Sequence, residues 1–135
     1  MSNNTSQPRV WPMLRARNPR DLIRFLTEAF GFEESVVYGD GERVDHAELS
    51  WPLGGGVMLG GTRDVADDPC GLVPGTFGAY VVTDAPDELF ARAVAAGARP
   101  VRELTDTDYG SRDFVVADPE GNRWSFGTYG GHVAE

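Results

Sequence analysis

The chain has 135 residues, a formal net charge of −9 at pH 7 and a single cysteine, Cys70. This length fits one domain, and 41% apolar residues is typical of a globular protein rather than a disordered one. The single cysteine excludes an intramolecular disulfide, and 21 acidic against 12 basic residues disfavours a nucleic acid partner, because an acidic surface repels phosphate.

The hydropathy pattern argues against a membrane partner. No stretch approaches the ~20 consecutive apolar residues that a spanning helix needs. Residues 1–8 are polar and lack the basic flank and apolar run of a signal peptide. We therefore expect a loose N-terminal tail over residues 1–8 and a cytoplasmic protein.

Residues 9–62 predict a strand, a helix and three further strands. The first strand is expected over Val10–Arg17, and Asn18-Pro19-Arg20-Asp21 indicates a helix start with Asn18 as the cap of the free amides. Apolar residues recur at helical spacing up to Phe30, and Gly31 ends the helix. The strands that follow are expected at Glu33–Tyr38, Arg43–Ser50 and Gly55–Gly60, with a turn at Gly39-Asp40-Gly41.

Residues 76–131 predict the same order of elements. A strand over Phe77–Thr83 precedes a helix that Asp84 is expected to cap, with Pro86 in its first turn and Gly97 at its end. Strands follow at Arg99–Thr105, Arg112–Ala117 and Asn122–Thr128, and Asp118-Pro119-Glu120-Gly121 is a turn between the last two.

Both halves therefore predict βαβββ, which an internal duplication explains. We expect one domain over residues 9–131, with module one at 9–62, a linker at 63–75 and module two at 76–131. The alternation of residues assigns strand faces: Ala47 and Leu49 lie on one face, and His46, Glu48 and Ser50 on the other. The fold class is α+β, an open, strongly curved mixed sheet around a cleft, with the helices on the convex side.

With this order of elements and its motifs, the sequence resembles the vicinal oxygen chelate superfamily. That superfamily includes glyoxalase I, extradiol dioxygenases, and fosfomycin and bleomycin resistance proteins. The resemblance covers about residues 9–130, and the turn Asp118-Pro119-Glu120-Gly121-Asn122 is its most specific part. The other matching segments are Pro12–Pro19, Phe30-Gly31-Phe32, His46–Leu49 and Gly97-Ala98. The resemblance implies paired βαβββ modules and a homodimer.

The metal enzymes of that superfamily place His or Glu ligands at four strand positions. The resemblance puts these positions on Trp11, Glu48, Ala79 and Ser125. Only Glu48 carries a good ligand, and one carboxylate does not hold a zinc, nickel or manganese ion tightly. We therefore expect no metal and no other cofactor. Trp11 instead offers a flat apolar surface, which suits a planar organic molecule.

Several further residues are candidates for ligand contact. His46 and Glu48 share a face and could act as acid and base, bind a ligand or, with a third group, hold an atypical metal. Arg15 could bind a ligand carboxylate or pair with Glu48. The remaining candidates are Met13 and Met58 in the cleft, Trp51 at its rim, and Tyr109 and Arg112 in a loop over its mouth.

Three functions remain open from the sequence. The first is a metal-independent binding protein similar to bleomycin resistance proteins, which sequesters a planar or cationic ligand and so confers antibiotic resistance. The second is a lyase, isomerase or dioxygenase of the same superfamily that uses Glu48 and His46. The third is an accessory protein with a vestigial cleft. The residues alone leave open whether the chain is an enzyme.

Overall fold

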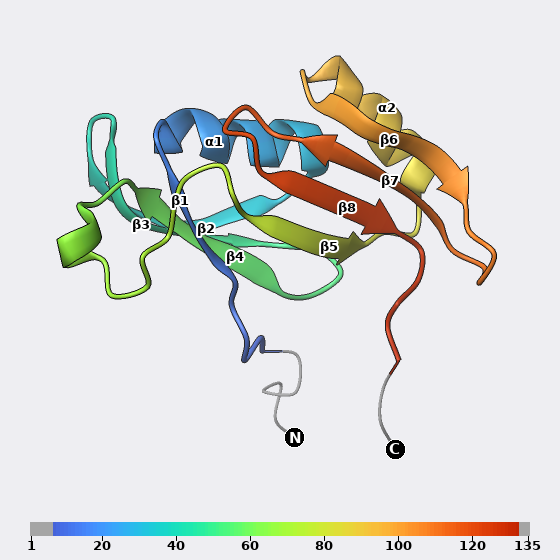
Figure 1. Ribbon diagram of the computed structural model, residues 1–135, viewed down its shortest axis with the longest axis horizontal. Helices are drawn as coiled ribbons and strands as arrows, with labels where there is room; N and C mark the ends of the chain where they lie inside the picture. The colour runs from blue at the N-terminus through green and yellow to red at the C-terminus, as the bar shows by residue number, and fades with distance from the viewer. Residues whose placement is uncertain (1–6, 133–135) are drawn as a thin grey trace.

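The computed structural model describes residues 7–132 and shows two modules of the same βαβββ order (Figure 1). The first contains β1 (Met13–Ala16), α1 (Pro19–Phe25) with the π-helical turn η2 (Leu26–Phe30), β2 (Glu33–Asp40), β3 (Arg43–Ser50) and β4 (Gly56–Gly61). After the short 3-10 turn η3 (Val65–Asp67), the second contains β5 (Gly78–Val82), α2 (Pro86–Ala95), β6 (Arg99–Asp106), β7 (Arg112–Ala117) and β8 (Arg123–Gly127).

Each module forms its own four-stranded mixed sheet. The strand order is β1-β4-β3-β2 in the first sheet and β5-β8-β7-β6 in the second. The pairs β1–β4 and β5–β8 are parallel, and the other neighbours are antiparallel. The helices lie above the sheets in Figure 1, and the described segments before β1 and after β8 run below them. The predicted α+β fold with two modules and an open curved sheet is confirmed.

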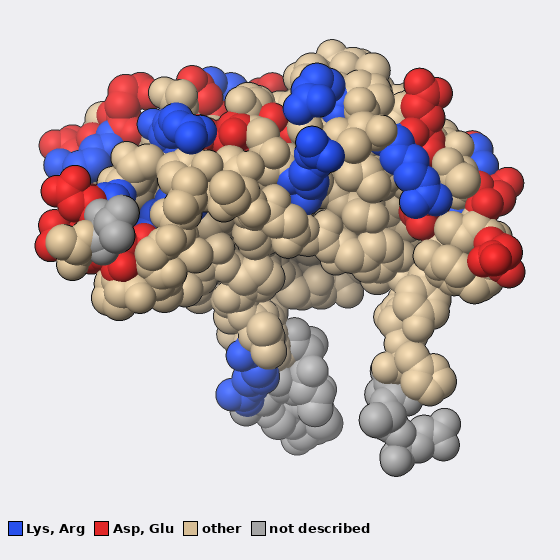
Figure 2. Space-filling model, in the orientation of Figure 1, with Lys and Arg blue, Asp and Glu red and all other residues tan. Residues whose placement is uncertain are grey.

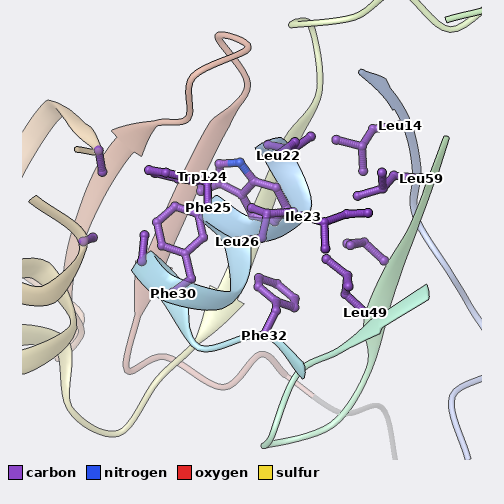
Figure 3. Packing of buried hydrophobic residues seen from close by; sticks show 14 of the residues in the cluster. Leu14, Leu22, Ile23, Phe25, Leu26, Phe30, Phe32, Leu49, Leu59 and Trp124 are labelled. Atoms are coloured by element: carbon purple, nitrogen blue, oxygen red, sulfur yellow. The ribbon is translucent and has the colours of Figure 1, made fainter. Parts of the chain in front are cut away.

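One hydrophobic core joins the modules through the end of the first helix. Phe30 packs against Trp124 at 5.6 Å and Phe126 at 4.8 Å between ring centroids, and Phe32 lies 5.6 Å from Trp124. Figure 3 shows the rings of Phe30, Phe32 and Trp124 around Leu26 of the helix. Trp124 and Phe126 are fully buried, as their parity in the last strand predicts.

The first strand begins later than predicted, and the first helix changes its form before its predicted end. The first strand begins at Met13 rather than Val10 because Pro12 has no N–H to donate to the ladder, although its carbonyl accepts the N–H of Met58 at 2.9 Å. The first helix runs to Phe30 as predicted, but its last five residues form a wider π turn. Gly31 ends it in the left-handed conformation, with φ 93°.

Asn18 is the N-cap residue of α1 as predicted, whereas the cap predicted for α2 is wrong. The side chain of Asn18 makes no capping hydrogen bond, and its own backbone N–H donates to a carboxylate of the second module. Ala85, not Asp84, is the N-cap of α2, and the hydroxyl of Thr83 accepts the N–H of Ala85 at 3.2 Å. A capping signal in the sequence identifies the start of a helix, but the group that satisfies its amides can come from elsewhere in the fold.

The turn between β7 and β8 shows why its residue pattern is specific. One carboxylate oxygen of Asp118 accepts the N–H groups of Glu120 and Asn122, at 2.8 and 3.0 Å. The other oxygen accepts Nδ2 of Asn122 and Nε1 of Trp124, each at 2.9 Å. Asn122 in turn accepts the N–H of Phe77 at 3.0 Å, so the turn also fixes the approach to β5.

Candidate functional site

Six of the predicted site residues lie on one face of the first sheet, which we call the open face. Alternation along the strands places five of them there, opposite the buried Leu14, Ala47, Leu49 and Leu59, and the sixth, which precedes β1, covers Gly56 on the same face. Met13 is the register partner of Met58, and Met58 is the partner of Glu48. The open face comprises Trp11, Met13, Arg15, His46, Glu48 and Met58.

A shallow cavity of about 220 Å³ lies at the Arg15 end of the open face. It is lined by Met13, Leu14, Arg15, His46, Met58, Leu59 and Arg63. The two methionines supply soft, adaptable apolar surface, whereas the arginines and the imidazole supply hydrogen-bond donors. The lining residues are therefore suited to an organic molecule that is partly apolar and partly polar.

Arg15 is held in place by the segment between the modules. Its Nε donates to Oδ2 of Asp68 at 3.1 Å, and the carboxylate of Asp68 also accepts the N–H groups of Cys70 and Leu72. The hydrogen bond from Arg15 holds the pKa of Asp68 below its usual range, against the opposing effect of burial. Arg15 thus pairs with Asp68, and the pairing with Glu48 that the sequence offered as one alternative is wrong.

Gly60 of β4 leaves room for the side chain of Arg15. Gly60 is the register partner of Arg15, and a Cβ on Gly60 would lie 3.0 Å from Nη1 of Arg15 and 2.8 Å from the carbonyl oxygen of Asp45. The guanidinium therefore occupies space over the sheet that only a glycine leaves open.

His46 and Glu48 form a close pair on β3. Nε2 of His46 lies 2.8 Å from Oε2 of Glu48, so the imidazole donates through Nε2 to the carboxylate. The ring of Tyr38 stacks on His46 with 6.3 Å between centroids and 18° between planes. The carboxylate of Glu48 is thus already engaged by a neighbour, and the His46 ring is held in one orientation.

Trp11 lies at the other end of the open face. A Cβ on Gly56 would lie 2.8 Å from Cζ3 of its ring, so the indole covers the start of β4. Trp11 is partly buried and does not line the cavity at Arg15. Trp11 covers Gly56 and Arg15 covers Gly60, so Met58 lies between the two positions along β4 on the same face.

Trp51 and Ala79 lie on the opposite side of the sheets from the open face. The indole of Trp51 packs on Phe32 and Phe126, at 5.0 and 5.9 Å between centroids, and Nε1 donates to the carbonyl of Val82 at 2.8 Å. Ala79 is the register partner of the buried Trp124. Both residues line a separate cavity of about 250 Å³ at the junction of the modules. The placement of Trp51 at the cleft rim and of Ala79 beside Ser125 is therefore corrected.

The candidates in the second sheet do not reach the open face. Ser125 is half-buried on the face opposite Trp124, and its register partner is Tyr80. Arg112 binds Asp87 and Asp106, with Nε 2.7 Å from Oδ1 of Asp87, and these partners raise its pKa. Tyr109 packs against Tyr129 at 5.8 Å. Arg112 and Tyr109 thus anchor the loop and the C-terminal segment of the second module.

The residues that the structure describes do not match the metal site of the related enzymes. No three His, Cys, Asp or Glu side chains gather there to hold an ion. Trp11 and Ala79 offer no donor atom, Glu48 is paired with His46, and Ser125 belongs to the other sheet. These residues therefore do not fit a catalytic metal ion at the four superfamily positions. Within residues 7–132, no helix is long and apolar enough to cross a membrane.

The sequence does not predict two residues of the site, Arg63 and Asp68. Both belong to the segment between the modules, whose composition indicates only a linker. Asp68 reaches Arg15 across 53 residues of chain, and Nη2 of Arg63 lies 3.3 Å from the carbonyl of Asp45. No local pattern predicts such contacts, because they depend on how the linker returns over the sheet.

Comparisons with known proteins agree with this architecture. A family model described as the Glyoxalase/Bleomycin resistance protein/Dioxygenase superfamily matches residues 10–126. An uncharacterised protein of Mycobacterium bovis is 35% identical over 131 residues, which cover 90% of this chain and 83% of the relative. An uncharacterised protein of Mycobacterium tuberculosis is 35% identical as well, with 74% of its length covered.

Solved structures share the fold. TioX from Micromonospora sp. ML1 superposes with a TM-score of 0.74 at 29% identity, covering 87% of this chain and 97% of TioX. A member of the same superfamily from Sphaerobacter thermophilus superposes with a TM-score of 0.68 at 16% identity, covering 89% of this chain and 97% of that one. At that identity the second likeness concerns the fold alone.

Proposed function

Because this chain belongs to the glyoxalase/bleomycin resistance protein/dioxygenase superfamily, we propose that it binds a small organic molecule on the open face of its first sheet, without a metal. The observation that carries the proposal is the cavity between β1, β3 and β4, where two methionines form an apolar floor beside arginine and histidine donors. Such a combination of apolar lining and few polar groups is typical of ligand sites.

The open face supports a planar ligand. Met13 and Met58 are register partners, so their side chains lie side by side and present one apolar surface. Trp11 continues that surface toward the start of β4 and could stack on an aromatic ring. In this role the protein holds its ligand and leaves it unchanged.

An enzyme is the second candidate, and one observation favours it. The 2.8 Å contact between His46 and Glu48 places a base and an orienting carboxylate beside the cavity. A histidine oriented in this way could take a proton from a bound molecule. If Glu48→Gln left turnover of an identified substrate unchanged, this role of the pair would be wrong.

A second copy of the chain would complete the site. The cavity of about 220 Å³ is smaller than the roughly 300–1,000 Å³ of sites for drug-sized ligands. Charged side chains in Figure 2 gather over the helices and at both ends of the molecule, whereas the surface below the sheets is largely uncharged. Exposed Val10, Met13 and Leu53 are among the apolar side chains available for such a contact. We therefore propose a homodimer.

A thermal-shift screen of planar aromatic compounds tests the function. It should be run once with a chelator and once with zinc, nickel, manganese or iron. We expect at least one compound to raise the melting temperature equally in both conditions. Met58→Asp should abolish the shift by introducing a charge into the apolar floor, whereas Val101→Asp, on an exposed position of the second sheet, should retain it.

Two outcomes contradict the proposal. The first is a compound that binds Met58→Asp as well as the wild-type protein, since the ligand would then lie elsewhere. The second is near-stoichiometric retention of one metal ion after desalting, together with binding only in its presence. A Trp11→Ala variant with unchanged affinity would remove the stacking role of Trp11 alone.

A further inference from the structure

The cavity on the open face ends in two arginines that converge on one stretch of backbone. Arg15 lies over Gly60, beside the carbonyl of Asp45, and Nη2 of Arg63 donates to that same carbonyl at 3.3 Å. Both side chains line the cavity. Two guanidinium groups repel each other unless negative charge lies between or beside them.

A β-bulge in β3 exposes the carbonyl that Arg63 binds. Tyr38 pairs with His46 and Gly39 with Val44, so Asp45 has no partner on β2. The bulge releases the backbone of Asp45 from the ladder, and its carbonyl becomes available to Arg63. Its own carboxylate is bound by Arg43, with Nε 3.1 Å from Oδ1. It is therefore not the anion that the two arginines require.

The charges of the two arginines are unequally compensated. Arg15 is paired with Asp68, whose side chain is only 3% exposed and lies outside the cavity lining. Within residues 7–132, Arg15 uses only Nε for that contact, which leaves its two terminal nitrogens without a hydrogen-bond partner. Arg63 has no carboxylate within 4 Å among the same residues. The free donors of these two arginines thus bring positive charge to the cavity.

We infer that the ligand of the open face carries an oxyanion, a carboxylate or a phosphate, which Arg63 and the terminal nitrogens of Arg15 bind. This inference rests on the proposed function and selects among its ligands. The cavity lining offers a cationic ligand no carboxylate, because that of Glu48 is bound by His46 and does not line the cavity. The planar guanidinium matches the geometry of a carboxylate or phosphate, and a hydrogen bond between charged groups is stronger than a neutral one.

Four probes with the same aromatic body test the inference: 2-naphthoate, 2-naphthyl phosphate, neutral 2-naphthamide and cationic 2-naphthylmethylamine. Calorimetric titration of the full chain at low ionic strength, with a chelator, gives each dissociation constant. We expect both anions to bind about tenfold more tightly than the amide, and the amine to bind most weakly. Added salt should weaken the anions and leave the amide unchanged.

Arg63→Gln should remove most of the preference for the anions while the amide binds as before. Arg99→Gln is the matched control, because it makes the same change of net charge at an exposed position in the second sheet and should leave the preference intact. The ratio between naphthoate and naphthyl phosphate shows which oxyanion the arginines favour.

The experiment distinguishes failure of this inference from failure of the proposed function. If all four probes bind equally well, or if Arg63→Gln leaves the preference unchanged, the inference is overturned and the proposed function stands. If the wild-type protein binds none of the four, the proposed function fails together with the inference. If the amine binds more tightly than the anions, the site prefers positive charge and the inference is overturned directly.

Discussion

The carboxylate of Glu120, in the second module, accepts the backbone N–H of Asn18, in the first module, at 2.7 Å. Its other oxygen accepts the N–H of Arg17 at 2.9 Å. A carboxylate at the start of a helix satisfies free amides and interacts favourably with the helix dipole. The turn that is most specific to the family therefore holds the first helix of the other module.

Replacement of Glu120 should destabilise the fold through that helix. We expect Glu120→Ala to lower the free energy of unfolding by about 1–2 kcal/mol, because α1 loses a cap that no local side chain supplies. Urea unfolding measures the change. Glu42→Ala, at an exposed turn position, is the control and should differ little from the wild-type protein. Equal stability of the two variants would show that the contact contributes nothing.

The pairing of Arg15 with Asp68 should make stability depend on pH. Because the hydrogen bond from Arg15 lowers the pKa of Asp68 in the folded state, the unfolded state binds more protons in acid. The stabilisation is complete at neutral pH and is lost as pH falls through the unfolded and then the folded pKa of the carboxyl group. The Asp68→Asn variant lacks this carboxyl group, so its stability does not depend on that titration.

The wild-type protein should therefore be more stable than Asp68→Asn at pH 7, and this difference should shrink as the pH approaches 3. Urea unfolding of both proteins across that range gives the comparison. A difference that stays constant with pH would contradict the role of the ion pair and assign the effect of the substitution to packing alone.

Trp51 should stabilise the junction between the modules without contributing to ligand binding. We expect Trp51→Phe to cost about 1 kcal/mol, because the carbonyl of Val82 loses its partner while most of the aromatic contact with Phe32 and Phe126 remains. Thermal unfolding measures this loss, with Leu53→Ala at an exposed site as the control. Affinity for 2-naphthoate should not change, and a large loss of affinity would place the ligand at the junction cavity instead.

The open face could be predicted from sequence because strand parity is a local property. Alternation placed His46 and Glu48 opposite Ala47 and Leu49, and the structure agrees. Ala79 shows the limit of that reasoning. Its position came from the resemblance, and a shift of one residue moves a side chain to the other face. The register with Trp124 puts Ala79 on the buried side.

The sequence by itself determined the order of the elements, the glycine ends of the helices and the Asp118 turn, because each depends on residues within a few positions of one another. Only the tertiary structure decided that Glu120 accepts the N–H of Asn18 at the start of the first helix, that Asp68 binds Arg15, and that Arg63 binds the carbonyl of Asp45. These contacts join residues that are 18 to 102 positions apart. They arise from the packing of the two modules and the path of the linker, which no local pattern of residues specifies.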